Sequence, residues 1–247
     1  MASILDRYGI KEVADVTFYK LNDDGTPGHP VLYLDTLKVS TIEQTAEEAE
    51  ARGGKGNAPL IIWDYGKEIN VTLEDALFSA KSMAIMFGNG QVDEGETKIR
   101  KTIHFVGGEN VSKPTHWETP SGEQRAVPSD AVCYDAKGEK ATTFEAGKKY
   151  FCTFEVDVEG QTIEISANSF PGTYYVVGDT YARSETTGKD EFFQFIIAKA
   201  KVQSENTITL EAEGDPSVFN MNLRVMRPAD GKMMKLVKYN LLPEAQG

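Results

Sequence analysis

The three histidines of this 247-residue chain are its most obvious candidates for chemistry. His29 stands in a turn before a proline, His104 in an alternating strand-like run, and His116 beside Trp117 in a loop. None has a second histidine or a cysteine at the spacing that zinc sites use. His116 and Glu118 could together hold an ion, but a surface loop explains both residues more simply. We therefore predict no metal site and no catalytic histidine.

Two cysteines, Cys133 and Cys152, lie in separate β-like runs. No Cys-x-x-Cys pair is present, which argues against the common redox and zinc motifs. The chain begins without the basic start and apolar core of a signal peptide, and no apolar run reaches transmembrane length. These features predict synthesis in the cytoplasm, where thiols stay reduced. We therefore expect two reduced, partly buried thiols.

Residues 52–57 read Arg-Gly-Gly-Lys-Gly-Asn and have the glycine content of a phosphate-binding loop. Such a loop follows its Gly-Lys with serine or threonine, after a buried strand. Here Lys55 is followed by Gly56, and the residues before the run are acidic and polar. The nucleophile elbow of serine hydrolases is absent too. We predict that the chain is not an enzyme and has no cofactor; a Ser-His-Asp triad assembled only in space is the hydrolase alternative.

The chain carries a formal net charge of -12 and has a pI near 4.8. Binding to nucleic acid by phosphate neutralisation needs clustered lysine and arginine, so this balance argues against it. Anionic membrane surfaces would repel the chain for the same reason. An acidic surface is nevertheless suited to line a channel through which DNA slides without adhering.

Residues 151–159 end in alternating apolar and acidic side chains, as in a strand with one buried face. A turn at Gly160 is expected to return the chain through residues 162–166 as a hairpin. No cation stands among these carboxylates in the sequence, so they face either solvent or something anionic. The candidates for a wall that faces an anion are Glu155, Asp157, Glu159 and Glu164.

Alternating and β-branched runs separated by turn residues predict the elements that position these side chains. We expect a mainly β fold, a β-sandwich or barrel with one flanking α-helix and long loops or arms, in a single domain over 1–247. The helix is expected over 74–87, with Glu74 and Asp75 in its first turn. Strands are expected at 12–19, 31–40, 61–65, 68–73, 102–106, 150–158, 162–166, 173–177, 191–202, 207–213 and 220–226.

Two segments break the strand pattern. Residues 43–57 combine glycines with charges, which predicts an irregular surface loop. Residues 107–149 are rich in proline and glycine in their first half, which predicts a long loop or an insertion. The last apolar stretch, 233–242, fits either a strand or an extended arm.

Two blocks of the sequence together resemble a known family. The first block consists of residues 8–16, 34–38, 51–57, 63–65 and 73–77, and the second of residues 170–174, 178–180, 187–194 and 211–216. In these blocks the chain resembles the tail tube proteins, and related virion structural proteins, of phages that infect Gram-positive bacteria. Residues 107–149 match nothing in that pattern.

The resemblance implies a structural protein of the virion tail, made in the host cytoplasm. Tail tube proteins form rings, usually of six subunits, that stack into a hollow tube for DNA. The partners implied are other copies of the chain, the tape measure, terminator and baseplate proteins, and a sheath where the tail is contractile. DNA passes through without specific binding, and no membrane is involved.

In this interpretation the acidic hairpin is the candidate wall of the bore, and the loop 43–57 is the candidate contact between subunits or rings. The contact candidates are Glu47, Glu48, Glu50, Arg52, Gly53, Gly54, Lys55 and Asn57. Another virion component, such as a terminator, a baseplate or hub protein or a decoration protein, is the first alternative. A carbohydrate-binding β-sandwich is the second, with Trp117 as its exposed platform.

Overall fold

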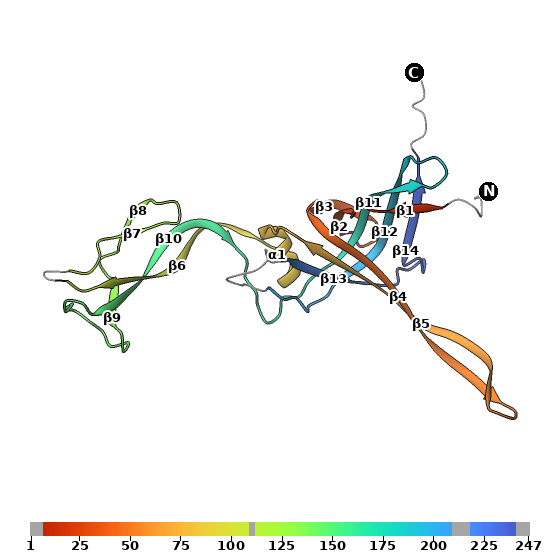
Figure 1. Cartoon of the computed structure of the whole chain (residues 1–247), viewed down its shortest axis with the longest axis horizontal. Coiled ribbons are helices and arrows are strands. Elements are labelled where there is room, and N and C mark those ends of the chain that lie inside the picture. Colours follow the sequence, from red (N-terminus) through yellow and green to blue (C-terminus); the bar gives the residue numbers. More distant parts are fainter. Residues whose placement is uncertain (1–6, 109–111, 209–217, 241–247) are drawn as a thin grey trace, which may run out of the picture. The chain divides into compact units, whose positions relative to one another are not determined.

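The computed structural model describes residues 7–108, 112–208 and 218–240. These residues form fourteen strands and one helix (Figure 1). The chain divides into two compact units: unit 1 comprises Met1–Val92 and Ile163–Gly247, and unit 2 comprises Asp93–Thr162. The prediction of a mainly β fold with one helix is confirmed, and none of the sheets among the described strands closes into a barrel.

Unit 1 contains a nine-stranded antiparallel sheet. The main path of the sheet runs in the order β3-β2-β11-β12-β13-β5-β4, while β1 pairs with β11 and β14 pairs with β12. The strands are β1 (Tyr8–Ile10), β2 (Asp15–Leu21), β3 (Pro27–Leu34), β4 (Leu37–Gly53), β5 (Ala58–Asp75), β11 (Thr173–Ser184), β12 (Asp190–Val202), β13 (Phe219–Val225) and β14 (Met234–Tyr239).

The core of unit 1 forms on one face of this sheet. On β5, Ile69, Val71 and Leu73 are buried in alternation with half-buried Asn70 and Thr72, the period of two that the sequence predicts. Further buried side chains come from β2, β11, β12 and β13, including Phe18, Val176, Ile197 and Leu223. Buried side chains at the inner ends of β4 and β5 hold the hairpin that these two strands form to the core.

The helix α1 (Ala80–Phe87) is shorter than the predicted span of 74–87. Ser79 caps its first turn, because the Ser79 side chain accepts a hydrogen bond from the Ser82 backbone while the Ser82 side chain accepts one from the backbone of Ser79. Glu74 and Asp75 belong to β5, and buried Asp75 accepts a 2.5 Å hydrogen bond from Thr36. The prediction that these two acids complement the helix dipole is therefore wrong.

The loop predicted at residues 43–57 is also wrong. β4 continues to Gly53, and β5 begins at Ala58 and unites the two strands predicted at 61–65 and 68–73. Residues 54–57 form the turn, in which the Asn57 N–H donates to the Gly54 carbonyl oxygen at 3.2 Å. Gly54 and Gly56 have φ values of 78° and 86°, so the glycines serve the turn and do not interrupt the strands.

Unit 2 contains a three-stranded sheet in the order β6-β10-β9 and a small hairpin, β7-β8. The predicted insertion, 107–149, lies inside this unit, which begins at Asp93 and ends at Thr162. The hairpin predicted at Gly160 is wrong, because β10 runs through Gly160 and pairs with β6 along its whole length. The strands are β6 (Asp93–Val106), β7 (His116–Glu118), β8 (Gln124–Ala126), β9 (Val132–Asp135) and β10 (Lys149–Thr162).

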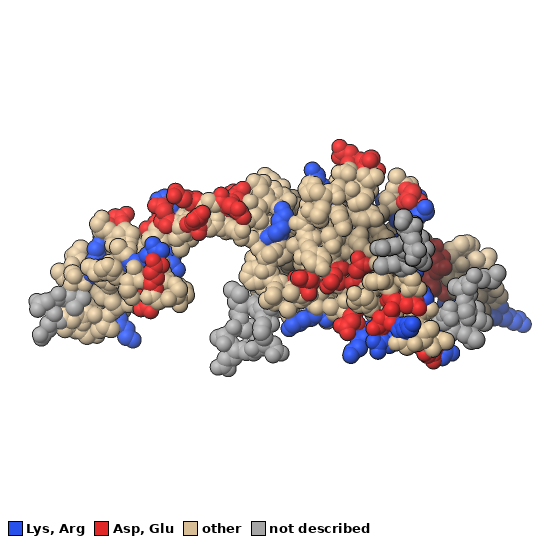
Figure 2. Space-filling model, turned by 90° about the horizontal axis from the view of Figure 1, so that it is seen from above, with Lys and Arg blue, Asp and Glu red and all other residues tan. Residues whose placement is uncertain are grey.

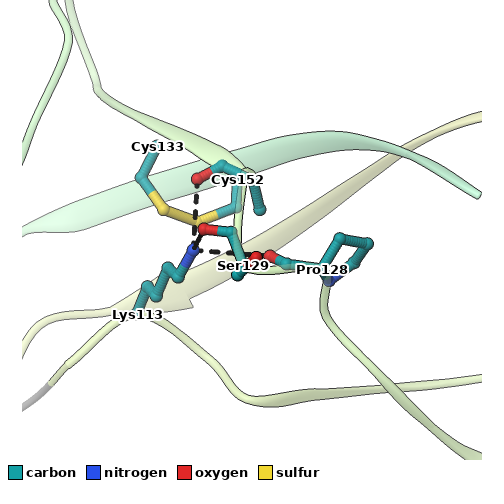
Figure 3. Close-up of a disulfide and its surroundings, with 6 residues drawn as sticks. Lys113, Pro128, Ser129, Cys133 and Cys152 are labelled. Carbon is teal, nitrogen blue, oxygen red and sulfur yellow. Dashed lines mark hydrogen bonds between the residues drawn. A yellow bond between two sulfur atoms is a disulfide. The ribbon is translucent and has the colours of Figure 1, made fainter.

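A disulfide links Cys133 and Cys152, so the expectation of two free thiols is wrong. The two residues lie directly opposite each other on β9 and β10, with their Cα atoms 4.0 Å apart. Beside the bond, the Lys113 ammonium donates to the carbonyl oxygens of Ser129 at 2.5 Å and Pro128 at 3.4 Å (Figure 3). The bond and the lysine together fix a part of unit 2 that has little regular structure.

The C-terminal stretch predicted as either a strand or an arm contains the strand β14, which pairs with β12 of the same chain. Tyr174 on β11 is buried in the core. Most of the strand predicted at 207–213 lies outside the described residues, and so does the last part of the second resemblance block, 211–216.

Candidate interaction surface

The outer part of the β4–β5 hairpin, residues 47–66, is here called the arm. It is the orange hairpin at the lower right of Figure 1. β5 pairs with both β4 and β13 at residues 70–75, whereas over the arm its partner is β4. A register shift between Thr45 and Glu47 and the positive φ of Gly66, 62°, mark where the arm begins. The core of unit 1 therefore holds only the inner end of the hairpin.

One face of the arm is apolar. Cross-strand pairing places Ala49 opposite Trp63, Ala51 opposite Ile61 and Glu47 opposite Tyr65, so these residues share a face. Ile61 is 50% exposed, and Trp63 and Tyr65 are each 52% exposed. An isolated exposed aromatic residue is ordinary, but a continuous strip of large apolar side chains on a protruding ribbon is typical of a protein–protein contact.

The opposite face of the arm is acidic. Glu48 lies directly across from Asp64, and Glu50 across from Ile62. Arg52 reaches Glu50 at 2.5 Å, whereas Glu48 and Asp64 have no ion-pair partner among the described residues. Like charges in directly opposed positions destabilise a pair of strands. This face therefore carries two carboxylates that a cation from another molecule would stabilise.

All eight contact residues predicted from the sequence lie on the β4 strand of the arm or in its turn. The predicted set did not include Ile61, Trp63 and Tyr65, which supply the apolar area from β5. Large apolar side chains at positions 61, 63 and 65 were the signal in the sequence for an apolar face on this strand. Because residues 43–57 were predicted to be a loop, the strand at 61–65 had no predicted partner strand with which to form such a face.

The four predicted bore acids are not brought together on one hairpin. Glu155 pairs with Arg100 at 2.7 Å and Asp157 with Lys98 at 3.1 Å, so two of the four acids have cationic partners, which come from β6 and not from their own run of residues. The hydrogen bond and charge of Asp157 raise the pKa of Lys98. The remaining two, Glu159 and Glu164, lie near the end of β10 and beyond it.

Additional acids extend this region of unit 2. β6 places Glu96 directly opposite Glu159, and Glu94 accepts a 2.8 Å hydrogen bond from Gln161. Figure 2 shows acidic side chains gathered along the β6–β10 ribbon, at the left of the view. The unpaired acidic charge of the ribbon is thus concentrated near Glu96 and Glu159.

The residues that could support other chemistry are dispersed. No group of three or more His, Cys, Asp and Glu side chains in the described ranges is placed to hold a metal ion. Trp117 is half-buried against Phe154, and the Lys101 ammonium lies 5.2 Å from the centre of its ring, so it does not form the exposed platform of the carbohydrate alternative. No helix in the described part of the chain has the length and apolar character required to span a membrane.

The chain belongs to the YomU/Tube protein family, whose model matches residues 8–238 and so includes both units and the whole arm. It is 26% identical over 196 residues to a protein of Bacillus phage SPR named tail tube protein; this match covers 75% of the present chain and 72% of the relative. The resemblance to phage tail tube proteins inferred from the sequence is thereby confirmed, and with it a structural role in the phage tail.

Proposed function

We propose that this chain is the repeating subunit of a phage tail tube and that it assembles into stacked rings, six subunits to a ring, through its arm. The observation that carries the proposal is the apolar face of the arm, with Ile61, Trp63 and Tyr65 each about half exposed. Buried aromatic side chains dominate the free energy of many protein interfaces. Family membership supports the same role.

A repeated contact between the arm and a different surface of the next copy can produce a ring or a filament. Such head-to-tail interfaces close into rings where the rotation allows and otherwise extend without limit. A tube needs contacts of both kinds, within a ring and between rings. The eight predicted contact residues and the apolar face together offer a two-sided ribbon for these contacts.

The proposal includes a bore through which DNA passes without specific binding. With six copies, the formal charge of a ring is 6 × -12 = -72. Glu155, Asp157, Glu159 and Glu164 are the proposed lining, to which Glu96 can be added because it lies opposite Glu159. Like-charge repulsion would keep the DNA backbone from adhering to such a wall.

In this function the chain is a virion protein without catalysis or a cofactor. Its proposed neighbours are copies of itself and the tape measure, terminator and baseplate proteins, with a sheath in a contractile tail. A terminator or hub is the principal alternative within the tail. Indefinite stacking distinguishes a tube subunit from either of these, because a terminator or hub forms one closed ring.

Sedimentation velocity over a range of concentrations tests the role of the arm. We expect the variant Ile61→Ser/Trp63→Ser/Tyr65→Ser to remain monomeric at concentrations where the unmodified chain assembles. The loss of three apolar anchors predicts association weaker by at least about a hundredfold. The matched control is Val106→Ser/Ile165→Ser/Phe170→Ser, which removes three similarly exposed apolar side chains outside the arm. Equal assembly of the two variants would contradict the proposal.

A further inference from the structure

A pocket of about 680 Å³ lies in unit 1 at the root of the arm. Four cationic residues line it, together with the apolar side chains of Met226 and Met233, and Glu68 is its one acidic lining residue. The chain as a whole has a net charge of -12, whereas the charged residues that line this pocket, four cations and one carboxylate, sum to a positive charge. The cations are Lys67, Lys201, Arg224 and Arg227.

Two of these cations are already engaged. Arg224 pairs with Glu68, and the Lys201 ammonium donates to the carbonyl oxygen of Pro171. Lys67 and Arg227 are exposed and have no ion-pair partner among the described residues. The pocket therefore presents two free positive charges beside an apolar floor. Met226, which is 39% exposed, contributes to that floor.

The acidic face of the arm has the matching pattern with opposite sign. Ile62, which is 52% exposed, shares this face with Glu48, Glu50 and Asp64. Glu50 is paired with Arg52, whereas Glu48 and Asp64 have no ion-pair partner in the described chain. Glu48 and Asp64 repel each other across the strands until a cation approaches. No described ion pair joins this face to the pocket of its own chain, so both surfaces are available to a neighbour.

We propose that the pocket receives the acidic face of the arm of a second copy. Glu48 and Asp64 meet Lys67 and Arg227, and Ile62 packs on Met226 and Met233. Each chain has one such face and one such pocket, so every copy can bind one neighbour and be bound by another. The inference rests on the proposed self-assembly and adds the surface that the arm contacts.

The test uses two charge-reversed chains. The arm variant, Glu48→Lys/Asp64→Lys, has a cationic arm and the original cationic pocket. The pocket variant, Lys67→Glu/Arg227→Glu, has an acidic arm and an acidic pocket. Each variant alone opposes like charges at the contact, whereas in a mixture every arm of one variant complements the pocket of the other. The controls make the same charge changes in unit 2, as Glu123→Lys/Glu139→Lys and Lys137→Glu/Lys140→Glu.

Critical assembly concentrations are measured by sedimentation for each chain and for the equimolar mixture, with thermal unfolding to verify that every variant is folded. We expect each variant alone to need a concentration at least about tenfold higher than the unmodified chain. The mixture should assemble close to the original concentration, and the controls should behave like the unmodified chain.

The outcomes separate the two proposals. If the unmodified chain assembles and either variant alone assembles like its control, the pocket assignment is overturned and the proposed function stands. A mixture of folded variants that does not recover assembly also overturns the pocket assignment. If the unmodified chain stays monomeric at every concentration, both the proposed function and this inference are overturned.

Discussion

Gly178 lies in the middle of β11, directly opposite Phe195 on β12. The Phe195 ring occupies the space where a side chain would stand: a Cβ atom on Gly178 would lie 2.1 Å from one ring carbon and 2.2 Å from another. Phe195 is itself buried in the core of unit 1. An aromatic ring that covers a glycine on the neighbouring strand is a known device for stabilising a sheet at such a position.

We predict that Gly178→Ala destabilises unit 1 by about 3 kcal/mol, because the buried Phe195 ring cannot move aside without displacing the core. The measurement is the free energy of unfolding in urea, with Gly9→Ala as the control. Gly9 lies in the same sheet and has nothing within 4 Å of its Cβ position. An effect of similar size at both positions would contradict this account of Gly178.

Arg183 and Asp190 close the β11–β12 hairpin with two hydrogen bonds of 2.7 Å each. These bonds and the charge of Arg183 lower the pKa of Asp190 below its ordinary value. A lowered folded-state pKa gives stability that is complete above the unfolded-state pKa and is lost as the pH falls through the folded-state pKa.

Asp190→Asn should therefore lower the melting temperature slightly at neutral pH, and the difference should shrink at acid pH, as the carboxyl group of the unmodified chain becomes protonated too. The effect should be small, since the pair is exposed to solvent. Melting curves of the two chains at both pH values provide the measurement. A difference that persists unchanged in acid would show that the ion pair is not its cause.

At the scale of elements, β9 depends on the disulfide. It is four residues long, and the bond joins it to the long central strand β10 across a sequence separation of 19 residues. We predict that Cys133→Ser/Cys152→Ser destabilises unit 2 by about 3 kcal/mol, the loss of loop entropy expected for this separation. Calorimetry should show a lower unfolding temperature for unit 2 and little change for unit 1.

Thiol titration of the purified, oxidised chain provides the control for this prediction. Fewer than one reactive thiol per denatured molecule is expected without a reductant, and two after reduction. Two thiols before reduction, together with an unchanged unfolding temperature in the double variant, would contradict a structural role for the bond.

The elements that the sequence predicted well are those with a local signal. Alternation at residues 69–73 marks the inner part of β5 correctly, and the run at 191–202 nearly coincides with β12. The predicted helix begins six residues before α1, because Glu74 and Asp75 are residue types that favour the first turn of a helix. Their pairing with β13, more than 140 positions away in sequence, is not visible locally.

The errors at the candidate sites have the same cause. A strand at 37–53 rich in glutamate and alanine is stable only because β5 pairs with it over its whole length. The cations beside Glu155 and Asp157 come from β6, and the partner of Cys133 comes from β10. None of these neighbours can be found from spacing along the chain, since each depends on the register of a distant strand.

At the scale of the whole molecule, the four acids proposed to line the bore should affect DNA passage and not assembly. Neutralising Glu155, Asp157, Glu159 and Glu164 to their amides should leave the critical assembly concentration unchanged within about twofold, because these residues lie outside the arm and the pocket. In virions that carry this variant, DNA ejection should slow. Failure of the variant to form tubes would assign these four residues to structure and contradict the bore assignment.

Negative-stain electron microscopy of the purified protein over a range of concentrations tests whether this single chain assembles through its arm. We expect rings that stack into hollow tubes as the concentration rises, and neither rings nor tubes in the variant Ile61→Ser/Trp63→Ser/Tyr65→Ser. Closed rings that never stack would favour a terminator or hub. Monomers at every concentration would contradict self-assembly, and tubes that form equally well without the three apolar side chains would contradict the role of the arm.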